Sequence, residues 1–192
     1  FIVITGIGFW LIAKIKQGLI TGLIALLVFF IARTCSFINA ERQQMIIVYN
    51  LPQRQAIDFV NGRGYLFYGD SDLLADDFIR NFHLKPCRIL NRLSPVKAIN
   101  NLIIDNKYAC YNNTRVLLAD TVISFSRSDK KYDLDLLIVS KNPKLYISKL
   151  SKVFNIKQAV FDGSVPAWKL KYWKKDCDSL HIPYHDVREK GA

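Results

Sequence analysis

Two uncharged apolar runs fill the first part of the chain, and a short polar turn separates them. Phe1–Ala13 reads FIVITGIGFWLIA and Gly18–Ala32 reads GLITGLIALLVFFIA, while Lys14–Gln17 supplies the turn. A bilayer-spanning helix needs about 20 apolar residues, so we expect the first run to be a truncated transmembrane helix. The second run extends to Ile38 if the side chain of Arg33 reaches the membrane interface. The pattern predicts a transmembrane helical hairpin.

The lysines of the turn set the expected orientation. Short loops rich in Lys and Arg stay in the cytoplasm, so Lys14 and Lys16 predict a cytoplasmic turn. A secretory signal peptide also carries lysines before an apolar run, but here a second apolar run precedes them and no small-residue cleavage site follows. We therefore expect residues 1–38 to lie in the membrane and residues 39–192 to form an extracytoplasmic domain.

From Met45 the pattern changes to short β-rich runs that are separated by turn signals. Asn61-Gly62-Arg63-Gly64 predicts a hairpin turn, and Ser71 is a suitable N-cap for a helix over Ser71–Phe82. The short spacing of these runs indicates antiparallel pairing. The expected strands are Met45–Asn50, Gln55–Val60, Tyr65–Tyr68, Ala98–Ile104, Lys107–Tyr111 and Thr114–Ala119.

The last third of the chain alternates strands with helices. Such alternation implies crossover connections and parallel strands, so an antiparallel half precedes a βαβαβ half in one mixed α/β domain. The expected order is a strand at Leu134–Ser140, a helix that begins at Asn142-Pro143, a strand at Gln158–Phe161, a helix at Pro166–Ser179 and a strand at His181–Val187.

Charge divides the chain at the same boundary as hydropathy. All 16 acidic residues lie from Glu41 onward, and the whole chain carries a net charge of +11. Without Lys14, Lys16 and Arg33, the remaining 24 basic residues exceed the acidic ones by eight. Such an excess attracts nucleic acid or anionic headgroups, although a solvated basic surface without a dedicated partner explains it equally well.

The helix expected at Pro166–Ser179 carries the most informative chemistry. Leu170, Trp173, Cys177 and Leu180 recur at helical spacing and are predicted to face the core. Aromatic rings interleaved with lysines on the opposite face can stack bases and neutralise phosphates without sequence preference. In the alternative interpretation, Trp168 packs under a neighbouring loop. The candidate DNA-binding residues on this helix are Trp168, Lys169, Lys171, Tyr172, Lys174 and Lys175.

Metal-ligand patterns are weak. His181 and His185 share a predicted strand, where residues four apart are about 13 Å from each other, too far for one ion. The acidic cluster from Asp70 to Asp77 lacks the spacing of a calcium loop and suits a helix N-terminus instead. The four cysteines show no CxxC pair, and Cys177 is expected to be a small buried hydrophobe. We expect no metal and no cofactor.

Several strings resemble the C-terminal extracytoplasmic part of ComEC-family proteins, the competence channels that carry single-stranded DNA across the bacterial inner membrane. VYNLPQ at Val48–Gln53, LLAD at Leu117–Asp120 and VSKNP at Val139–Pro143 occupy the places of motifs in the family's metallo-β-lactamase-like domain. The strings DLLIVSKNPKLYI, FDGS-x-PAWK and WKKDC-x-SLHIPYH look like the divergent Bacteroidetes-type version. The resemblance implies a degenerate metallo-β-lactamase-like β-sheet domain with flanking helices.

The departures from that family pattern bear on activity. A dinuclear zinc site of this superfamily needs an H-x-H-x-D-H cluster, which this sequence lacks. Asp120 is the surviving candidate ligand, and Lys141 and Asn142 stand where the family has a metal histidine. The resemblance therefore implies a vestigial site at Asp120 and Asn142 without catalytic residues, and we add Lys141 to the candidate DNA contacts.

The function that these expectations favour is non-catalytic guidance of single-stranded DNA by the membrane-anchored domain of a competence channel. The expected partners are single-stranded DNA, membrane lipid, the rest of the same channel polypeptide and other competence proteins. Two alternatives stay open. One is a structural domain that caps the membrane bundle, and the other is a metal-dependent nuclease completed by residues from elsewhere in the polypeptide.

Overall fold

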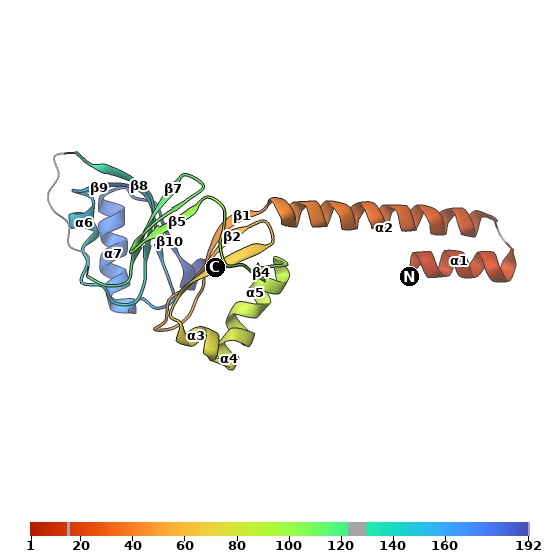
Figure 1. Cartoon of the computed structure of the whole chain (residues 1–192), viewed down its shortest axis with the longest axis horizontal. Coiled ribbons are helices and arrows are strands. Elements are labelled where there is room, and N and C mark those ends of the chain that lie inside the picture. The colour runs from red at the N-terminus through yellow and green to blue at the C-terminus, as the bar shows by residue number, and fades with distance from the viewer. Residues whose placement is uncertain (15, 123–129, 192) are drawn as a thin grey trace. The chain divides into compact units, whose positions relative to one another are not determined.

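The computed structural model describes residues 1–14, 16–122 and 130–191, so Ile15 of the predicted turn lies outside the described residues. The chain divides into two compact units, Phe1–Gln43 and Gln44–Ala192. Figure 1 labels their elements in chain order. The predicted boundary after residue 38 falls inside the second helix, because that helix continues through polar residues to Arg42.

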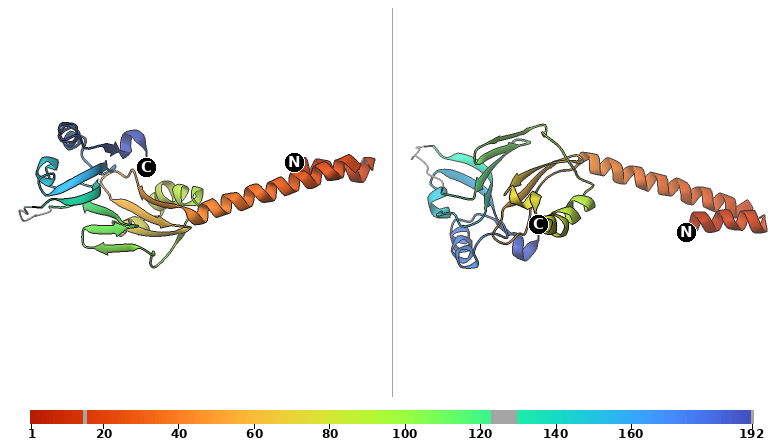
Figure 2. Two further views of the ribbon diagram at one scale, coloured as in Figure 1. Left: turned by 90° about the horizontal axis from the view of Figure 1, so that it is seen from above. Right: turned by 60° about the horizontal axis from the view of Figure 1, so that its bottom comes forward.

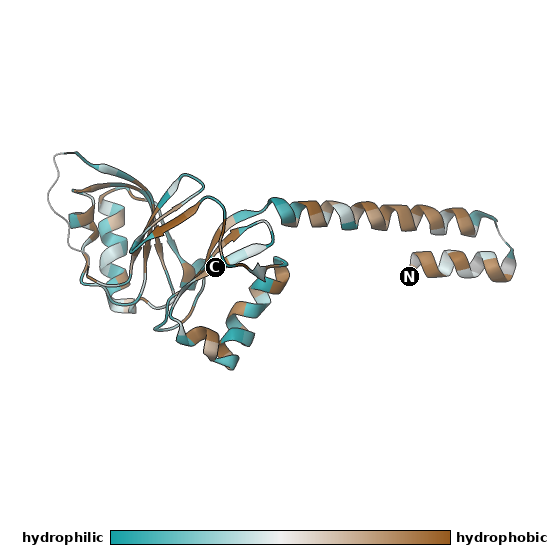
Figure 3. Ribbon diagram, in the orientation of Figure 1, coloured by the Kyte–Doolittle hydropathy of each residue, from teal (hydrophilic) through white to brown (hydrophobic). Residues whose placement is uncertain are grey.

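Unit 1 holds helices α1 (Ile2–Ala13) and α2 (Lys16–Arg42), which contact each other where Gly6 lies against Gly18 and Gly22. Within the described part of the chain, α2 alone is long and apolar enough to cross a membrane. Figure 3 shows hydrophobic residues along most of α2. The prediction of a transmembrane hairpin is therefore wrong: the structure has one long apolar helix.

Unit 2 begins with a four-stranded sheet, sheet A. Its strands are β1 (Gln44–Val48), β2 (Ala56–Asn61), β3 (Gly64–Gly69) and β4 (Ser94–Pro95), in that spatial order. The first three strands pair antiparallel, and the turn between β2 and β3 places Gly62 at φ 59°, which glycine adopts without strain. The predicted hairpin is confirmed.

The single helix predicted over Ser71–Phe82 is wrong. The chain instead forms α3 (Asp72–Ala75), α4 (Asp77–Ile79), a π-helical turn η1 (Arg80–Leu84) and α5 (Lys85–Leu90). Asp76 has an extended backbone that ends α3, and its carboxylate accepts hydrogen bonds from the first amides of α4. Pro86 has no backbone N–H, which accounts for the wider π turn before α5.

The second sheet, sheet B, has six strands in the order β10-β9-β8-β7-β6-β5. Strands β5 to β7 pair antiparallel and β7 to β10 pair parallel, so the predicted change from an antiparallel to a βαβαβ half is confirmed. The strands are β5 (Leu102–Asp105), β6 (Tyr108–Tyr111), β7 (Thr114–Ala119), β8 (Tyr132–Val139), β9 (Phe154–Phe161) and β10 (Tyr184–Asp186).

Three helices follow the parallel strands: α6 (Ile147–Leu150), α7 (Ala167–Ser179) and α8 (Val187–Lys190). The helix expected to begin at Asn142-Pro143 begins only at Ile147, after an extended Tyr146. Just before this segment, the backbone of Lys141 has φ 61° and its N–H donates to Ser164 Oγ. This contact with the next loop fixes a non-helical path.

Three cores give unit 2 four layers, which can be followed in Figure 2. One core joins α3–α5 to sheet A and includes Leu73 and Leu84. A second lies between the two sheets, where Phe59 and Tyr111 meet with ring centroids 5.9 Å apart. The third joins sheet B to α6 and α7. Unit 2 is therefore a mixed α/β domain of two mixed sheets between helical layers.

Candidate nucleic-acid interface

Helix α7 is anchored to sheet B by its buried face. Trp173 stacks on Phe161 of β9, with ring centroids 6.0 Å apart and an interplanar angle of 12°. Its indole Nε1 donates to the Leu145 carbonyl at 3.0 Å, which ties α7 to the segment after β8. Cys177 is also buried, as predicted, whereas Leu180 is 37% exposed because it lies just past the last helical residue.

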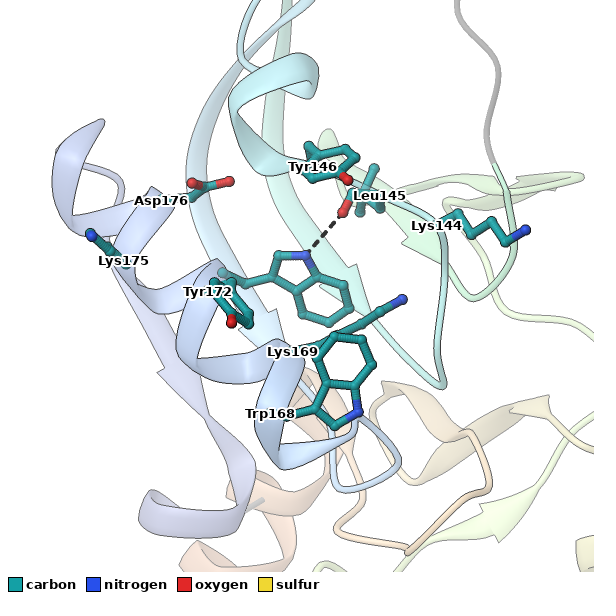
Figure 4. A pocket seen from close by; sticks show the side chains of 9 residues that line it. Lys144, Leu145, Tyr146, Trp168, Lys169, Tyr172, Lys175 and Asp176 are labelled. Carbon is teal, nitrogen blue, oxygen red and sulfur yellow. Dashed lines mark hydrogen bonds between the residues drawn. The ribbon is translucent and has the colours of Figure 1, made fainter.

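The outer face of α7 and the segment after β8 enclose a groove of about 640 Å³, which we call the aromatic groove (Figure 4). Trp168 is 59% exposed and Tyr172 67% exposed, so the alternative of a covered Trp168 is wrong. Tyr146, which the sequence did not single out, adds a third ring at 61% exposure. The lining residues are Lys144, Leu145, Tyr146, Trp168, Lys169, Tyr172, Trp173, Lys175 and Asp176.

Lys169 is held in position within the aromatic groove. Its Nζ donates to the Pro143 carbonyl at 2.8 Å and lies 5.5 Å from the Trp168 ring centroid and 5.7 Å from that of Trp173. Lys149 likewise lies 5.0 Å from the ring centroid of Tyr146. Cationic charge and aromatic faces are therefore placed side by side, as contact with both phosphate and base requires.

The remaining lysines of α7 separate into two groups. Lys171 and Lys175 are exposed, and Lys175 lines the groove. Lys174 instead pairs with Asp186 at 2.6 Å and Glu189 at 2.8 Å. Burial lowers the pKa of its ammonium, but hydrogen bonds to these carboxylates outweigh burial and the net shift is upward. Its charge is already compensated, so we leave Lys174 out of the candidate interface.

Lys141 and Asp120 lie outside the aromatic groove, in a group that we call the paired-charge cluster: Asp70, Lys107, Asp120 and Lys141. Lys141 Nζ pairs with Asp70 Oδ1, and Lys107 Nζ pairs with Asp120 Oδ1. Both ion pairs affect the pKa of the Tyr68 hydroxyl. Burial raises this pKa, nearby Asp120 raises it further, and Lys141 lowers it. Asn142 is exposed beside Lys141. The sequence placed Asp120 and Lys141 together but gave no signal for Asp70 and Lys107.

In the paired-charge cluster, the positive charges beside the carboxylates come from lysine side chains, whereas in a metal site they would come from the metal ion. Each carboxylate is matched by an ammonium rather than by further ligands. Across the described ranges, no group of three or more His, Cys, Asp or Glu side chains gathers as a metal site would require. His181 precedes β10 and His185 lies within it, so the two do not share a strand as predicted.

A buried carboxylate supports the loop that leads into α7. Asp162 is 1% exposed and accepts hydrogen bonds from Ser164 N at 2.9 Å and from Ser164 Oγ. Burial raises the pKa of Asp162 to about 6, and the hydrogen bonds from Ser164 oppose that rise. The next residue, Gly163, has no room for a Cβ, which would lie 2.7 Å from Leu51 N. The loop entering α7 is therefore closely packed against the loop after β1.

Asp162→Asn is expected to stabilise the protein at neutral pH, because the amide keeps an acceptor for Ser164 without a buried charge. The raised pKa means that the folded state holds the proton more tightly, so the wild type loses stability as pH rises from about 4 to 6. Above that window the variant should gain on the order of 2 kcal/mol. Urea denaturation at several pH values measures the difference, and a gap that does not shrink below pH about 4 contradicts the prediction.

Comparison with known proteins gives the chain a family. No curated protein and no solved structure matches it. The family model described as the ComEC C-terminal domain matches residues 46–192, from within β1 through the end of the chain. That match is consistent with a competence protein, and the ComEC family is membrane-associated. Since the match covers most of the sequence and agrees with the motifs quoted above, the chain belongs to the ComEC C-terminal domain family.

Proposed function

We propose that unit 2 is the extracytoplasmic domain of a ComEC-like competence channel, and that it holds incoming single-stranded DNA in the aromatic groove without cutting it. The observation that carries the proposal is the groove itself, where three exposed rings from two segments alternate with lysines. Stacking on an aromatic ring contributes about 1–3 kcal/mol per base and tolerates every base. A channel that imports DNA of any sequence needs contacts of this kind.

Charge supports the same ligand. Lys144, Lys169 and Lys175 line the groove and Lys171 is exposed nearby on α7, whereas Asp176 is the acidic residue among the lining groups. Lysines at such a groove raise the local concentration of a polyanion and make its affinity depend on salt. Exposed rings in the groove favour single strands over duplex DNA, because paired bases hide their faces in the stack.

The absence of hydrolysis is part of the proposal. We propose that the two-sheet domain is a degenerate metallo-β-lactamase-like fold, which its helix–sheet–sheet–helix layering supports. At the place of the family's metal site, Lys107 and Lys141 neutralise Asp120 and Asp70. An ammonium can replace the charge of a metal ion but cannot activate water as a Lewis acid. We therefore propose that this domain needs no metal or other cofactor and is not an enzyme.

We further propose that α2 anchors unit 2 in the bacterial cell membrane, with Lys14 and Lys16 on the cytoplasmic side. The length and hydropathy of α2 support this placement, and so does the preference of lysine-rich short loops for the cytoplasm. The rest of the channel polypeptide and other competence proteins would be its partners there.

Replacing both exposed rings of α7, in Trp168→Ala/Tyr172→Ala, is expected to weaken binding of single-stranded DNA by about thirtyfold or more. The full chain would be held in discs of zwitterionic lipid, and its affinity for a labelled oligonucleotide measured over a salt series. Tyr132→Ala is the matched control, because Tyr132 is 59% exposed on β8 and does not line the groove. It should bind as the wild type does.

The lysines have a matched control of their own. Lys175→Glu changes a lysine that lines the groove, whereas Lys152→Glu makes the same charge change at an exposed position that does not line it. A loss of DNA affinity in Lys175→Glu but not in Lys152→Glu, together with a weaker dependence of that affinity on salt concentration, supports the proposal. Absence of binding at low salt, or equal losses in both variants, would leave the structural cap as the better account of this domain.

A further inference from the structure

The helical layer over sheet A carries a row of exposed apolar side chains. Phe78, Phe82, Pro86 and Leu90 recur every four residues along α4, η1 and α5, and we call this row the apolar stripe. Phe78 is 64% exposed, Phe82 67% and Leu90 82%. The Phe78 and Phe82 ring centroids are 4.6 Å apart, so the two rings form one continuous surface. Ile89, 65% exposed, widens the row.

The fold does not use the apolar stripe. This layer packs on sheet A through other positions, chiefly Leu73, Leu84 and Arg88, all of them buried. Aromatic and aliphatic side chains that gather in a row on a helical surface mark a site of contact with a protein or a membrane. The charges beside the stripe distinguish between these two partners.

Those charges are cationic. Between Phe78 and Leu93 the sequence has Arg80, His83, Lys85 and Arg92 besides buried Arg88, and it has no acidic residue. Lys85 is exposed, and Arg80 shares its charge with Asp77. Aromatic and aliphatic side chains flanked by Lys and Arg fit the boundary between acyl chains and anionic headgroups. Acidic residues stand before Phe78, and the nearest of them, Asp77, pairs with Arg80, so the stripe from Phe82 onward has cationic neighbours.

The short connection between α2 and β1 is consistent with a membrane as the partner of the stripe. Gln43 alone separates the end of α2 from the first residue of β1, the edge strand of the sheet on which this layer packs. The apolar run of α2 extends at most to Ile38, six positions before β1 begins at Gln44, so the membrane boundary of α2 is close to sheet A along the chain. Removal of phenylalanine and leucine side chains from water and attraction of cations to an anionic surface both favour such binding.

We propose that the apolar stripe binds the surface of an anionic phospholipid bilayer. Phe78, Phe82 and Leu90 enter the boundary between headgroups and acyl chains, while Lys85 and Arg92 contact headgroup phosphates. The result is a second membrane contact of unit 2, in addition to α2, that limits the domain's rotation about its tether. This proposal does not depend on DNA binding.

Fluorescence from a single introduced tryptophan tests the contact. The full chain carrying Trp10→Phe, Trp168→Phe and Phe82→Trp is placed in vesicles of phosphatidylglycerol and phosphatidylcholine in equal parts, with lipids brominated on their acyl chains. The emission of Trp173, which is 3% exposed, is measured in the parent without Phe82→Trp and subtracted. Ile103→Trp in the same background is the matched control, since Ile103 is 70% exposed on edge strand β5. Quenching by bromine is expected to be several-fold stronger at position 82 than at 103, and quenching by aqueous iodide correspondingly weaker.

Charge provides the second readout. Adding Lys85→Glu/Arg92→Glu, or omitting phosphatidylglycerol, is expected to return position 82 to strong iodide quenching. Equal iodide quenching at positions 82 and 103 in anionic vesicles would overturn the proposal. Protection from iodide without quenching by brominated lipid would also overturn it, because a protein rather than lipid would then cover the stripe.

Discussion

Arg88→Met is expected to lower the free energy of unfolding by about 3–5 kcal/mol, one of the two largest losses that the structure predicts. Arg88 of α5 donates Nε to Asp58 Oδ2 at 2.8 Å and an Nη to Asp58 Oδ1 at 2.9 Å, and Asp58 is fully buried. The guanidinium also lies 4.1 Å from the Tyr65 ring centroid. Methionine fills a similar volume but leaves the Asp58 charge buried with too few donors.

Tyr49 cannot compensate for that loss. Its hydroxyl already donates to Asp58 Oδ2 at 2.7 Å, and burial followed by the Asp58 charge raises the pKa of the phenol, so it stays protonated. A hydrogen bond from a neutral donor to a charged carboxylate contributes about 1.5–3 kcal/mol, less than the missing ion pair.

A triple variant separates the ion pair from simple packing. Asp58→Leu/Arg88→Met/Tyr49→Phe removes all three polar groups, and a buried ionic group replaced by apolar side chains often costs little. Most of the stability lost in Arg88→Met should therefore return. Urea denaturation of the full chain in detergent micelles measures all variants. Equal losses in the single and triple variants would show that Arg88 acts through its packing.

Trp173→Ala is expected to cost about 3–5 kcal/mol, because it empties the contact between α7 and sheet B. Trp173 is 3% exposed, stacks on Phe161 and donates to the Leu145 carbonyl. The variant should also lose DNA binding, since the same side chain joins the two walls of the aromatic groove. Thermal or urea unfolding reports the first effect and oligonucleotide titration the second.

Two neighbours of this substitution act as controls. Trp173→Phe keeps a ring on Phe161 but loses the N–H and part of the buried volume of the indole, so it should cost about 1–3 kcal/mol, less than Trp173→Ala. Trp168→Ala removes an exposed ring and should change stability by about 1 kcal/mol or less while it weakens DNA binding. If Trp168→Ala unfolded the protein as Trp173→Ala does, the outer face of α7 would be structural.

Much of the fold follows from local pattern. The alternating runs of sheet A, the antiparallel strands β5–β7 and the βαβαβ end are read from periodicity and turn residues alone. The core face of α7 follows from its helical spacing, apart from Leu180. Errors occur where the backbone depends on a distant partner: Lys141 is fixed by Ser164, which delays α6 to Ile147.

The sequence predicted only part of the candidate site, because some of its features depend on contacts between distant segments. Trp168, Lys169, Tyr172 and Lys175 lie at one groove because they share one face of a helix. Tyr146 comes from a segment more than twenty residues away in the chain, so no spacing rule connects it with α7. Lys174 looked equivalent to its neighbours, but two carboxylates from the end of the chain neutralise it.

The sequence by itself therefore determined the apolar N-terminal segment, the mixed α/β class, the ComEC family and the basic aromatic face of α7. These features depend on composition, period and short motifs, which are local properties. The tertiary structure alone decided which lysines keep an unpaired surface position, which carboxylates receive an ammonium, and which third ring completes the groove. Those outcomes depend on contacts between residues far apart in the chain, where burial and pairing set the energy of a charge or a ring.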